Sequence, residues 1–345
     1  PRTERLAREY DRVSESCVVA RASDVVVLCV GLDERYEGEA HHISTGECIG
    51  GDKEDLHFPE TQRKLIDAVL DCGTPVVLCC MAGSCMDLSP YADRAAAVIQ
   101  TWYPGAEGGQ VLADILAGKT APSGKLPVTF YGGDYEIPDF TDYSLKNRTY
   151  RYVEQGVLYP FGYGLSYTTF EYDNLQVKPD GATFTLRNTG KYDGAEIAQL
   201  YVGLPGAKVF RPVKELKGFS KVFLKAGEEK TVTIKFDDKT FRYWNMKTNK
   251  WEVEGGVYSI MIGASCADIR LQDSLAIIGT TEVMPYYTNR VSSYVEGKIQ
   301  QIGNEEYETI LGHSIPDGSW SGELGMNDAL CQMYYAKSGI ARFIC

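Results

Sequence analysis

Three short, unbroken apolar runs with helical patterns between them most constrain how the first third of this chain can fold. The runs are Asp24–Val30, Pro75–Cys80 and Ala95–Ile99. A short β-branched run bounded by polar residues is typical of a strand buried on both faces. Strands that alternate with helices pair in parallel through right-handed crossovers. The pattern therefore predicts a parallel-rich α/β-sandwich domain over residues 1–135.

Two helices are expected among these strands. Residues 59–68 carry apolar side chains at helical spacing behind Pro59 and an acidic residue, both favoured in a first helical turn. Gly73 lies where that helix should end. A shorter helix is expected over residues 110–117, with Gly118 after it.

The hydrophobic pattern changes to a period of two after about residue 167. Short alternating strands separated by Gly, Asp and Asn turns indicate an antiparallel β-sandwich over residues 167–280. Residues 136–166 are rich in Tyr, Pro and Gly without periodicity, which predicts an ordered connector. Residues 281–345 are mixed and partly helical, and we expect this C-terminal tail to pack on another domain. The alternating segments are 182–188, 198–202, 230–236 and 257–262.

Composition and charge argue against several kinds of partner and location. The net charge of -12 disfavours nucleic acid and anionic membranes, because both bind clustered Lys and Arg. No apolar run approaches the roughly 20 residues that cross a bilayer, and no signal peptide is visible. The 10 cysteines include Cys29, Cys79 and Cys80 inside apolar runs and form no Cys-x-x-Cys pair. We therefore expect a reducing, cytoplasmic location rather than a disulfide framework.

An acidic segment directly follows the first predicted strand. Glu34, Glu37 and Glu39 lie in the loop that begins near Gly31, at the carboxyl end of the strand, where ligands bind in open α/β sheets. A carboxyl group can donate a proton, accept one or attack a substrate, depending on how its surroundings shift its pKa. Glu37 and Glu39 would face opposite ways in an extended segment, so only one is expected to reach a given site. A solvated surface loop remains the alternative.

A glycosidase would need a second carboxyl group from a different element. Its two carboxyl groups flank the scissile bond, about 5–5.5 Å apart in retaining enzymes and about 6.5–9.5 Å apart in inverting ones. Two acids from one loop cannot easily flank a sugar ring. The acidic loop therefore supplies at most half of such a site.

The remaining candidate motifs predict neither a metal nor a cofactor. His41 and His42 adjoin the acidic loop, but neighbouring histidines diverge in an extended loop, so a surface or sugar-contacting role is expected. The turn Pro104–Gly109 lacks the dinucleotide fingerprint and follows the third strand rather than the first. Phosphate-binding and Gly-x-Ser-x-Gly nucleophile motifs are also missing from the sequence. A nucleotide-binding oxidoreductase is thus disfavoured, and no cofactor is expected.

Six segments follow one another along the chain: Gly31–Glu39, Gly50–Gln62, Trp102–Gly109, Pro122–Thr129, the highly specific Tyr159–Phe170, and Lys214–Phe219 in the predicted β-sandwich. In this order they resemble the C-terminal half of family 3 glycoside hydrolases, the family of β-glucosidases and β-xylosidases. The resemblance covers about residues 1–280. The β-sandwich resembles the family's fibronectin type III-like domain, and the tail resembles an extension found in some bacterial members.

The resemblance implies double displacement with retention at the anomeric carbon. In the family, an aspartate nucleophile comes from a (β/α)₈ barrel, and a glutamate of the α/β-sandwich domain acts as acid and then as base. Glu39 matches that glutamate by position, with Glu37 as the runner-up. The implied substrate is a β-linked oligosaccharide or an aryl or alkyl glycoside, and a terminal β-D-glucosyl residue is favoured over a β-xylosyl residue.

The sequence departs from the family pattern in one respect. It contains no segment that resembles the barrel or its nucleophile segment, and Pro1 corresponds to a point after the first strand of the family's α/β-sandwich domain. The chain alone is therefore expected to be inactive without a barrel partner, and its Glu39 to be an ordinary carboxylate. The alternative hypothesis is a non-catalytic scaffold that binds carbohydrate or a partner protein.

Overall fold

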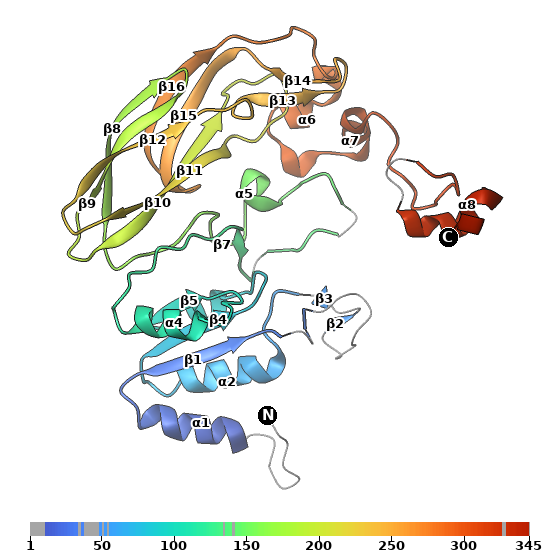
Figure 1. The fold of residues 1–345 in the computed structure, drawn as a ribbon. Helices are drawn as coiled ribbons and strands as arrows, with labels where there is room; N and C mark the ends of the chain where they lie inside the picture. The colour runs from blue at the N-terminus through green and yellow to red at the C-terminus, as the bar shows by residue number, and fades with distance from the viewer. Residues whose placement is uncertain are drawn as a thin grey trace.

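The structure is a computed structural model in which an α/β layer and a β-sandwich are joined by a connector, with the first part of the tail beside the sandwich (Figure 1). This arrangement confirms the predicted fold class. None of the described helices is long and apolar enough to span a membrane. The residues described are 11–33, 36–37, 48–49, 52–53, 55–133, 135–139, 142–325 and 329–344.

The first sheet contains the three predicted strands in parallel, in the order β1-β4-β5. β4 is the central strand and is largely buried on both faces, as predicted. β1 differs from the prediction because Val27 and Cys29 are exposed on one of its faces. β1 is an edge strand, and within the described ranges helices cover only its other face. The bounds are β1 Val26–Gly31, β4 Val76–Met81 and β5 Ala97–Gln100.

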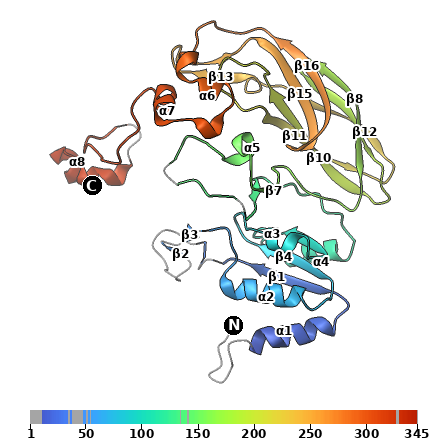
Figure 2. The ribbon, with the colours of Figure 1, turned by 180° about the vertical axis from the view of Figure 1, so that it is seen from behind.

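Helices α1 and α2 lie side by side on one side of this sheet (Figures 1 and 2). α2 and α4 confirm the two predicted helices. The buried side chains of α2 are Ile66 and Val69, which lie on one stripe of the helix. The sequence did not predict α1, because its apolar residues do not form one clear stripe. In the structure, its Val18 and Val19 are exposed. The bounds are α1 Asp11–Arg21, α2 Glu60–Leu70, α3 Ser89–Ala92 and α4 Gly108–Leu116.

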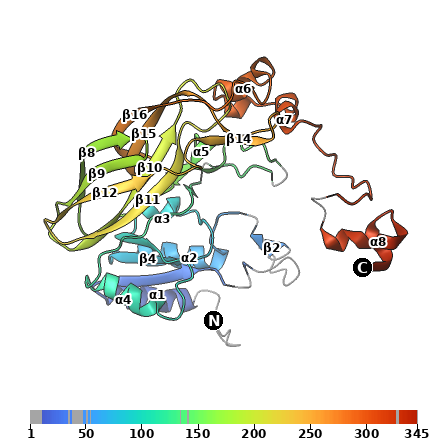
Figure 3. The ribbon, with the colours of Figure 1, turned by 45° about the horizontal axis from the view of Figure 1, so that its top comes forward.

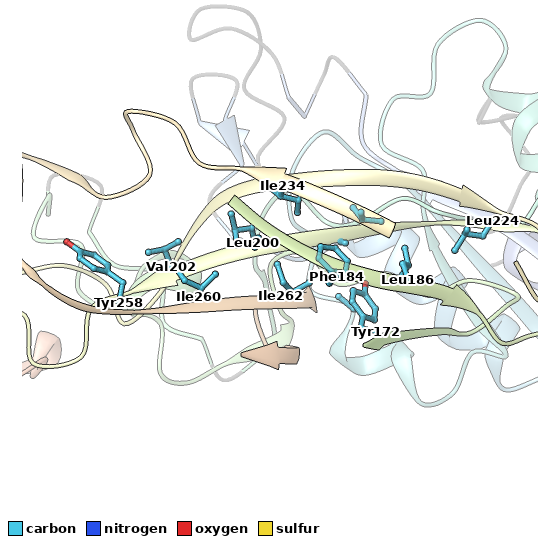
Figure 4. Close-up of a cluster of buried hydrophobic side chains, with 14 of the residues drawn as sticks. Tyr172, Phe184, Leu186, Leu200, Val202, Leu224, Ile234, Tyr258, Ile260 and Ile262 are labelled. Atoms are coloured by element: carbon cyan, nitrogen blue, oxygen red, sulfur yellow. The ribbon is translucent and has the colours of Figure 1, made fainter. Parts of the chain in front are cut away.

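The β-sandwich consists of two antiparallel sheets, in the orders β11-β10-β15-β16 and β12-β9-β8. Alternate side chains of both sheets point inward and form one apolar core, which includes Phe184, Leu200 and Ile262 (Figure 4). The period-two pattern of the sequence is thus confirmed. The bounds are β8 Phe170–Lys178, β9 Gly181–Asn188, β10 Gly194–Gly203, β11 Glu215–Leu224, β12 Glu229–Lys235, β13 Arg242–Asn245, β14 Lys250–Val253, β15 Gly256–Ser265 and β16 Asp268–Ile277.

The connector and the tail meet in a further apolar cluster beside the sandwich. Tyr152 of the connector packs there with Val209 and with Tyr286, Tyr294 and Ile299 of the tail. The first part of the tail therefore packs on other parts of the chain, as expected, whereas α8 lies away from the body (Figure 3). The bounds are β6 Phe130–Tyr131, α5 Thr149–Tyr152, β7 Val157–Tyr159, η1 Thr288–Arg290, α6 Ser292–Val295, η2 Ile299–Gln301, α7 Asn304–Leu311, η3 Leu330–Tyr335 and α8 Gly339–Ile344.

Candidate functional site

The carboxyl end of β1 is held by its neighbours on two sides. The Gln62 side chain of α2 donates from Nε2 to the Gly31 carbonyl at 2.7 Å and accepts from the Gly31 amide at 2.9 Å. Leu32 donates its amide to the Met81 carbonyl at 2.9 Å. A Cβ at Gly31 would lie 1.8 Å from the Met81 carbonyl oxygen, so only glycine fits here. The acidic loop, residues 32–53, therefore leaves the sheet from a fixed point.

Glu37 lies where the loops after all three parallel strands meet. Its amide donates to the Asp33 carbonyl at 3.0 Å, which closes a turn directly after β1. Its carboxylate accepts hydrogen bonds from the Gly83 amide at 3.0 Å and from the hydroxyl groups of Ser84 and Tyr103. Gly83 and Ser84 follow β4, and Tyr103 follows β5. The site thus forms at the sheet edge where ligands bind in open α/β folds.

The close approach at Gly83 requires a glycine. A Cβ at this position would lie 2.9 Å from Cε2 of the Tyr103 ring and 3.0 Å from Oε2 of Glu37. Any side chain would therefore displace either the ring or the carboxylate. The absence of a Cβ lets the Gly83 amide reach the carboxylate.

The electrostatics keep Glu37 ionised. Partial burial on its own raises the pKa of Glu37, but the hydrogen bonds from Ser84, Tyr103 and Gly83 and the charge of Lys53 outweigh it, so the pKa lies below its usual value. Burial and the hydrogen bond to Glu37 raise the pKa of Tyr103 to about 12. Glu37 is therefore an anion that accepts hydrogen bonds from neutral donors at neutral pH.

Lys53 contacts the residues that directly follow Ser84. It belongs to β3 (Asp52–Lys53), which pairs with β2 (Cys48–Ile49) in a short hairpin. Its ammonium group donates to the Cys85 carbonyl and lies 3.4 Å from Sδ of Met86. Burial lowers the pKa of Lys53, although the negative charge of Glu37 acts in the opposite direction.

The cysteines near Lys53 do not form a nucleophile. Burial raises the pKa of the Cys80 thiol to about 12 and also raises the pKa of the Cys85 thiol. A thiol with a raised pKa stays protonated at neutral pH, and the thiolate is the reactive form. In the part of the chain that the structure describes, no three His, Cys, Asp or Glu side chains are arranged to hold a metal ion.

The structure describes only part of the predicted site. Glu39, His41, His42 and Glu34 lie outside the described residues, whereas Glu37 is described in detail. Sequence reasoning did not identify the partners of Glu37 and of the strand ends. Three of these partners lie in segments that carry the family resemblance, whereas Ser84 has no signal in the sequence. The partners are Lys53, Gln62, Ser84 and Tyr103.

Comparison with known proteins agrees with this fold. Residues 5–167 match the model of the glycosyl hydrolase family 3 C-terminal domain, and residues 196–266 match that of the fibronectin type III-like domain. A xylan 1,4-β-xylosidase from Xylanibacter ruminicola is 38% identical over 271 residues, which cover 76% of this chain and 31% of that relative. The thermostable β-glucosidase B of Acetivibrio thermocellus is 36% identical over 309 residues, which cover 84% of this chain and 39% of that relative.

Solved structures show the same similarity. The crystal structure of a β-glucosidase from Bifidobacterium adolescentis has a TM-score of 0.71 at 31% identity and covers 89% of this chain and 45% of that chain. A β-D-glucoside glucohydrolase from Trichoderma reesei has a TM-score of 0.71 at 28% identity and covers 77% of this chain and 42% of that chain.

These matches define the class of the chain, an α/β-sandwich domain paired with a fibronectin type III-like domain of glycoside-hydrolase type. The chain spans 31% and 39% of the length of the two curated relatives described above. It belongs to glycoside hydrolase family 3 and corresponds to the C-terminal part of the family's enzymes.

Proposed function

We propose that this chain supplies the acid/base carboxyl group of a retaining β-glycosidase. The aspartate nucleophile comes from a (β/α)₈ barrel that is not part of these 345 residues, and the chain alone is inactive. The observation that carries the proposal is the acidic loop, which leaves the carboxyl end of β1 beside the loops after β4 and β5. An acid from this edge could face a sugar held against a second domain.

Glu39 is the proposed acid and base, and the surroundings of Glu37 support this choice. A general acid must be protonated near neutral pH, so its pKa has to rise above the ordinary glutamate value of about 4.3. Burial beneath a sugar and a nearby anionic nucleophile would both raise the pKa of Glu39. Glu37 has the opposite property, a lowered pKa and a carboxylate already bonded to three donors.

The proposed substrate is a terminal, non-reducing β-D-glucosyl residue. Two of the relatives and structures named above are β-glucosidases, which favours a glucoside. A β-xyloside is the second candidate, because the relative from Xylanibacter ruminicola is a β-xylosidase. His41 and His42 follow Glu39 directly in the sequence and are proposed as weak sugar contacts.

The test combines the chain with a barrel polypeptide of the same family. We expect hydrolysis of 4-nitrophenyl β-glucoside by the mixture, slower hydrolysis of the matching β-xyloside, and none by the chain alone. Glu39→Gln should slow poor leaving groups by about 10²-fold or more and activated aryl glycosides far less, because only poor leaving groups need the proton. Equal slowing of both substrates would contradict the role of Glu39.

A further inference from the structure

Both described ends of the acidic loop are fastened to one short segment. This anchor segment, Gly83–Asp87, follows the central strand β4. At its start, the Gly83 amide and the Ser84 hydroxyl bind the Glu37 carboxylate. Further along, the Cys85 carbonyl accepts from the ammonium group of Lys53. The two charged side chains thus bind neighbouring positions of the same piece of backbone.

The anchor segment is itself held firmly. Met86 and Leu88 are buried in the core of the α/β layer. The Asp87 amide donates to the Leu56 carbonyl at 2.7 Å, and the buried Asp87 carboxylate accepts from the Ser89 amide at 2.9 Å and the Ser89 hydroxyl at 2.6 Å. A segment with a packed core on one side and satisfied polar groups on the other resists displacement.

Tyr103, in the loop after β5, adds a third point of attachment. Its hydroxyl group donates to Glu37 and lies 3.2 Å from the Leu32 carbonyl oxygen at the start of the acidic loop. About half of Tyr103 remains exposed, so burial of the ring is not what holds it in place. Its hydrogen bond to Glu37 is therefore the contact that matters here. Glu37 therefore joins the loops that follow β1, β4 and β5.

We infer that Glu37 and Lys53 are positioning residues, which hold the two ends of the acidic loop on the anchor segment and so determine where Glu39 lies. This inference rests on the proposed function. Cα atoms two residues apart are separated by at most about 7 Å, so fixing Glu37 restricts the position of Glu39. Displacing a catalytic acid by about 1 Å can lower the rate of the reaction by about 10²-fold.

Two variants remove the attachment of Glu37, one completely and one in part. Glu37→Ala removes all three contacts of the carboxylate, and Tyr103→Phe removes one hydroxyl group from a half-exposed ring. Glu154→Ala is the matched control, because the Glu154 side chain is exposed and the hydrogen bond recorded for the residue uses its backbone amide. Tyr103→Phe keeps the inference testable if Glu37→Ala fails to fold.

The first measurement is amide hydrogen exchange on the 345-residue chain, which needs no substrate. We expect exchange at Gly83, Tyr36 and Glu37 to accelerate by about 10-fold in Glu37→Ala and by a smaller factor in Tyr103→Phe, because local opening becomes easier. The control should exchange at the wild-type rate. Wild-type exchange at these amides in both variants would overturn the inference.

The second measurement uses the chain combined with the barrel polypeptide. We expect Glu37→Ala to lower kcat for an alkyl glucoside by about 10-fold or more, while the alkaline limb of the pH profile persists, because Glu39 still titrates. Added azide should yield no glycosyl azide. Loss of that limb together with a glycosyl azide product would make Glu37 the acid/base group and overturn the inference while leaving a glycosidase in place.

The failure of the proposed function has a different signature. Glu39→Gln with wild-type kinetics on poor leaving groups would remove Glu39 from the reaction and, with it, the role inferred for Glu37. The exchange rates at Gly83 would still report the attachment of the loop, so the two failures are distinguishable.

Discussion

The α/β layer and the β-sandwich each have an apolar core, but the site edge of the α/β layer is held in a different way. The sandwich has one continuous apolar core, with residues from Tyr172 to Ala264, to which both sheets contribute alternate side chains. At the site edge of the α/β layer, the acidic loop is held by side-chain hydrogen bonds to Glu37 and Lys53. Apolar packing depends on a pattern that recurs along a strand, whereas these contacts depend on single groups from distant segments. The β-sandwich is therefore a scaffold held by apolar packing, whereas the site edge is held by polar contacts.

The largest expected effect lies in the core of the sandwich. Phe184 is 1% exposed, and Phe184→Ala should lower the free energy of unfolding by about 3–5 kcal/mol, since it removes a large buried ring and leaves a cavity. Urea denaturation of the 345-residue chain, followed by circular dichroism, measures the change. Phe223→Ala, on a ring that is 54% exposed, is the control and should cost much less. If both variants lost the same free energy of unfolding, burial of Phe184 would not explain the stability of the sandwich.

A second large effect is expected where the two regions are joined. Lys125 and Glu196 form an ion pair at 3.0 Å, with side chains that are 12% and 9% exposed. Lys125→Met should cost about 3–5 kcal/mol, because it leaves a buried carboxylate without its partner. The double variant Lys125→Met/Glu196→Gln should recover part of the loss in thermal denaturation.

The exposed ion pair of Arg94 with Asp67, at 2.6 Å, provides the control for this prediction. Arg94→Ala should cost about 1 kcal/mol or less, because water and salt screen exposed charges. If Arg94→Ala were as costly as Lys125→Met, burial would not explain the cost of breaking the Lys125–Glu196 pair.

A smaller effect is expected at the site edge. Gly83→Ala should destabilise the chain by about 1–3 kcal/mol, because its Cβ would meet both Tyr103 and Glu37. Gly109→Ala in α4 is the matched control, since nothing lies within 4 Å of its Cβ position. That substitution should be neutral or stabilising, because alanine favours a helix. Thermal denaturation of both variants decides the comparison.

The smallest effect concerns pH. The pKa of folded Glu37 lies below its unfolded value, so its contribution to stability is present above the unfolded pKa of about 4.3 and is lost as the pH falls through the folded pKa. The stability difference between the wild type and Glu37→Gln should therefore shrink as the pH falls below about 4. Chemical denaturation from pH 6 to pH 3 measures it, and a difference that grows on acidification would contradict the lowered pKa.

Local pattern was enough to predict most of the fold. The apolar runs at 75–80 and 95–99 became β4 and β5, and the alternating segments became strands of the sandwich, because burial of a face requires that periodicity. The prediction failed where packing partners decide the outcome. β1 has the composition of a doubly buried strand, but its edge position leaves Val27 and Cys29 exposed.

The sequence by itself determined the order of the elements, the family and the presence of acids after β1, because these depend on local periodicity and motifs. Only the tertiary structure decided which groups meet at that edge. Ser84 and Tyr103 are separated from Glu37 by 47 and 66 residues, and they reach it because parallel strands bring their carboxyl ends together. Those contacts make Glu37 an anchored anion, a property that its position in the sequence does not reveal.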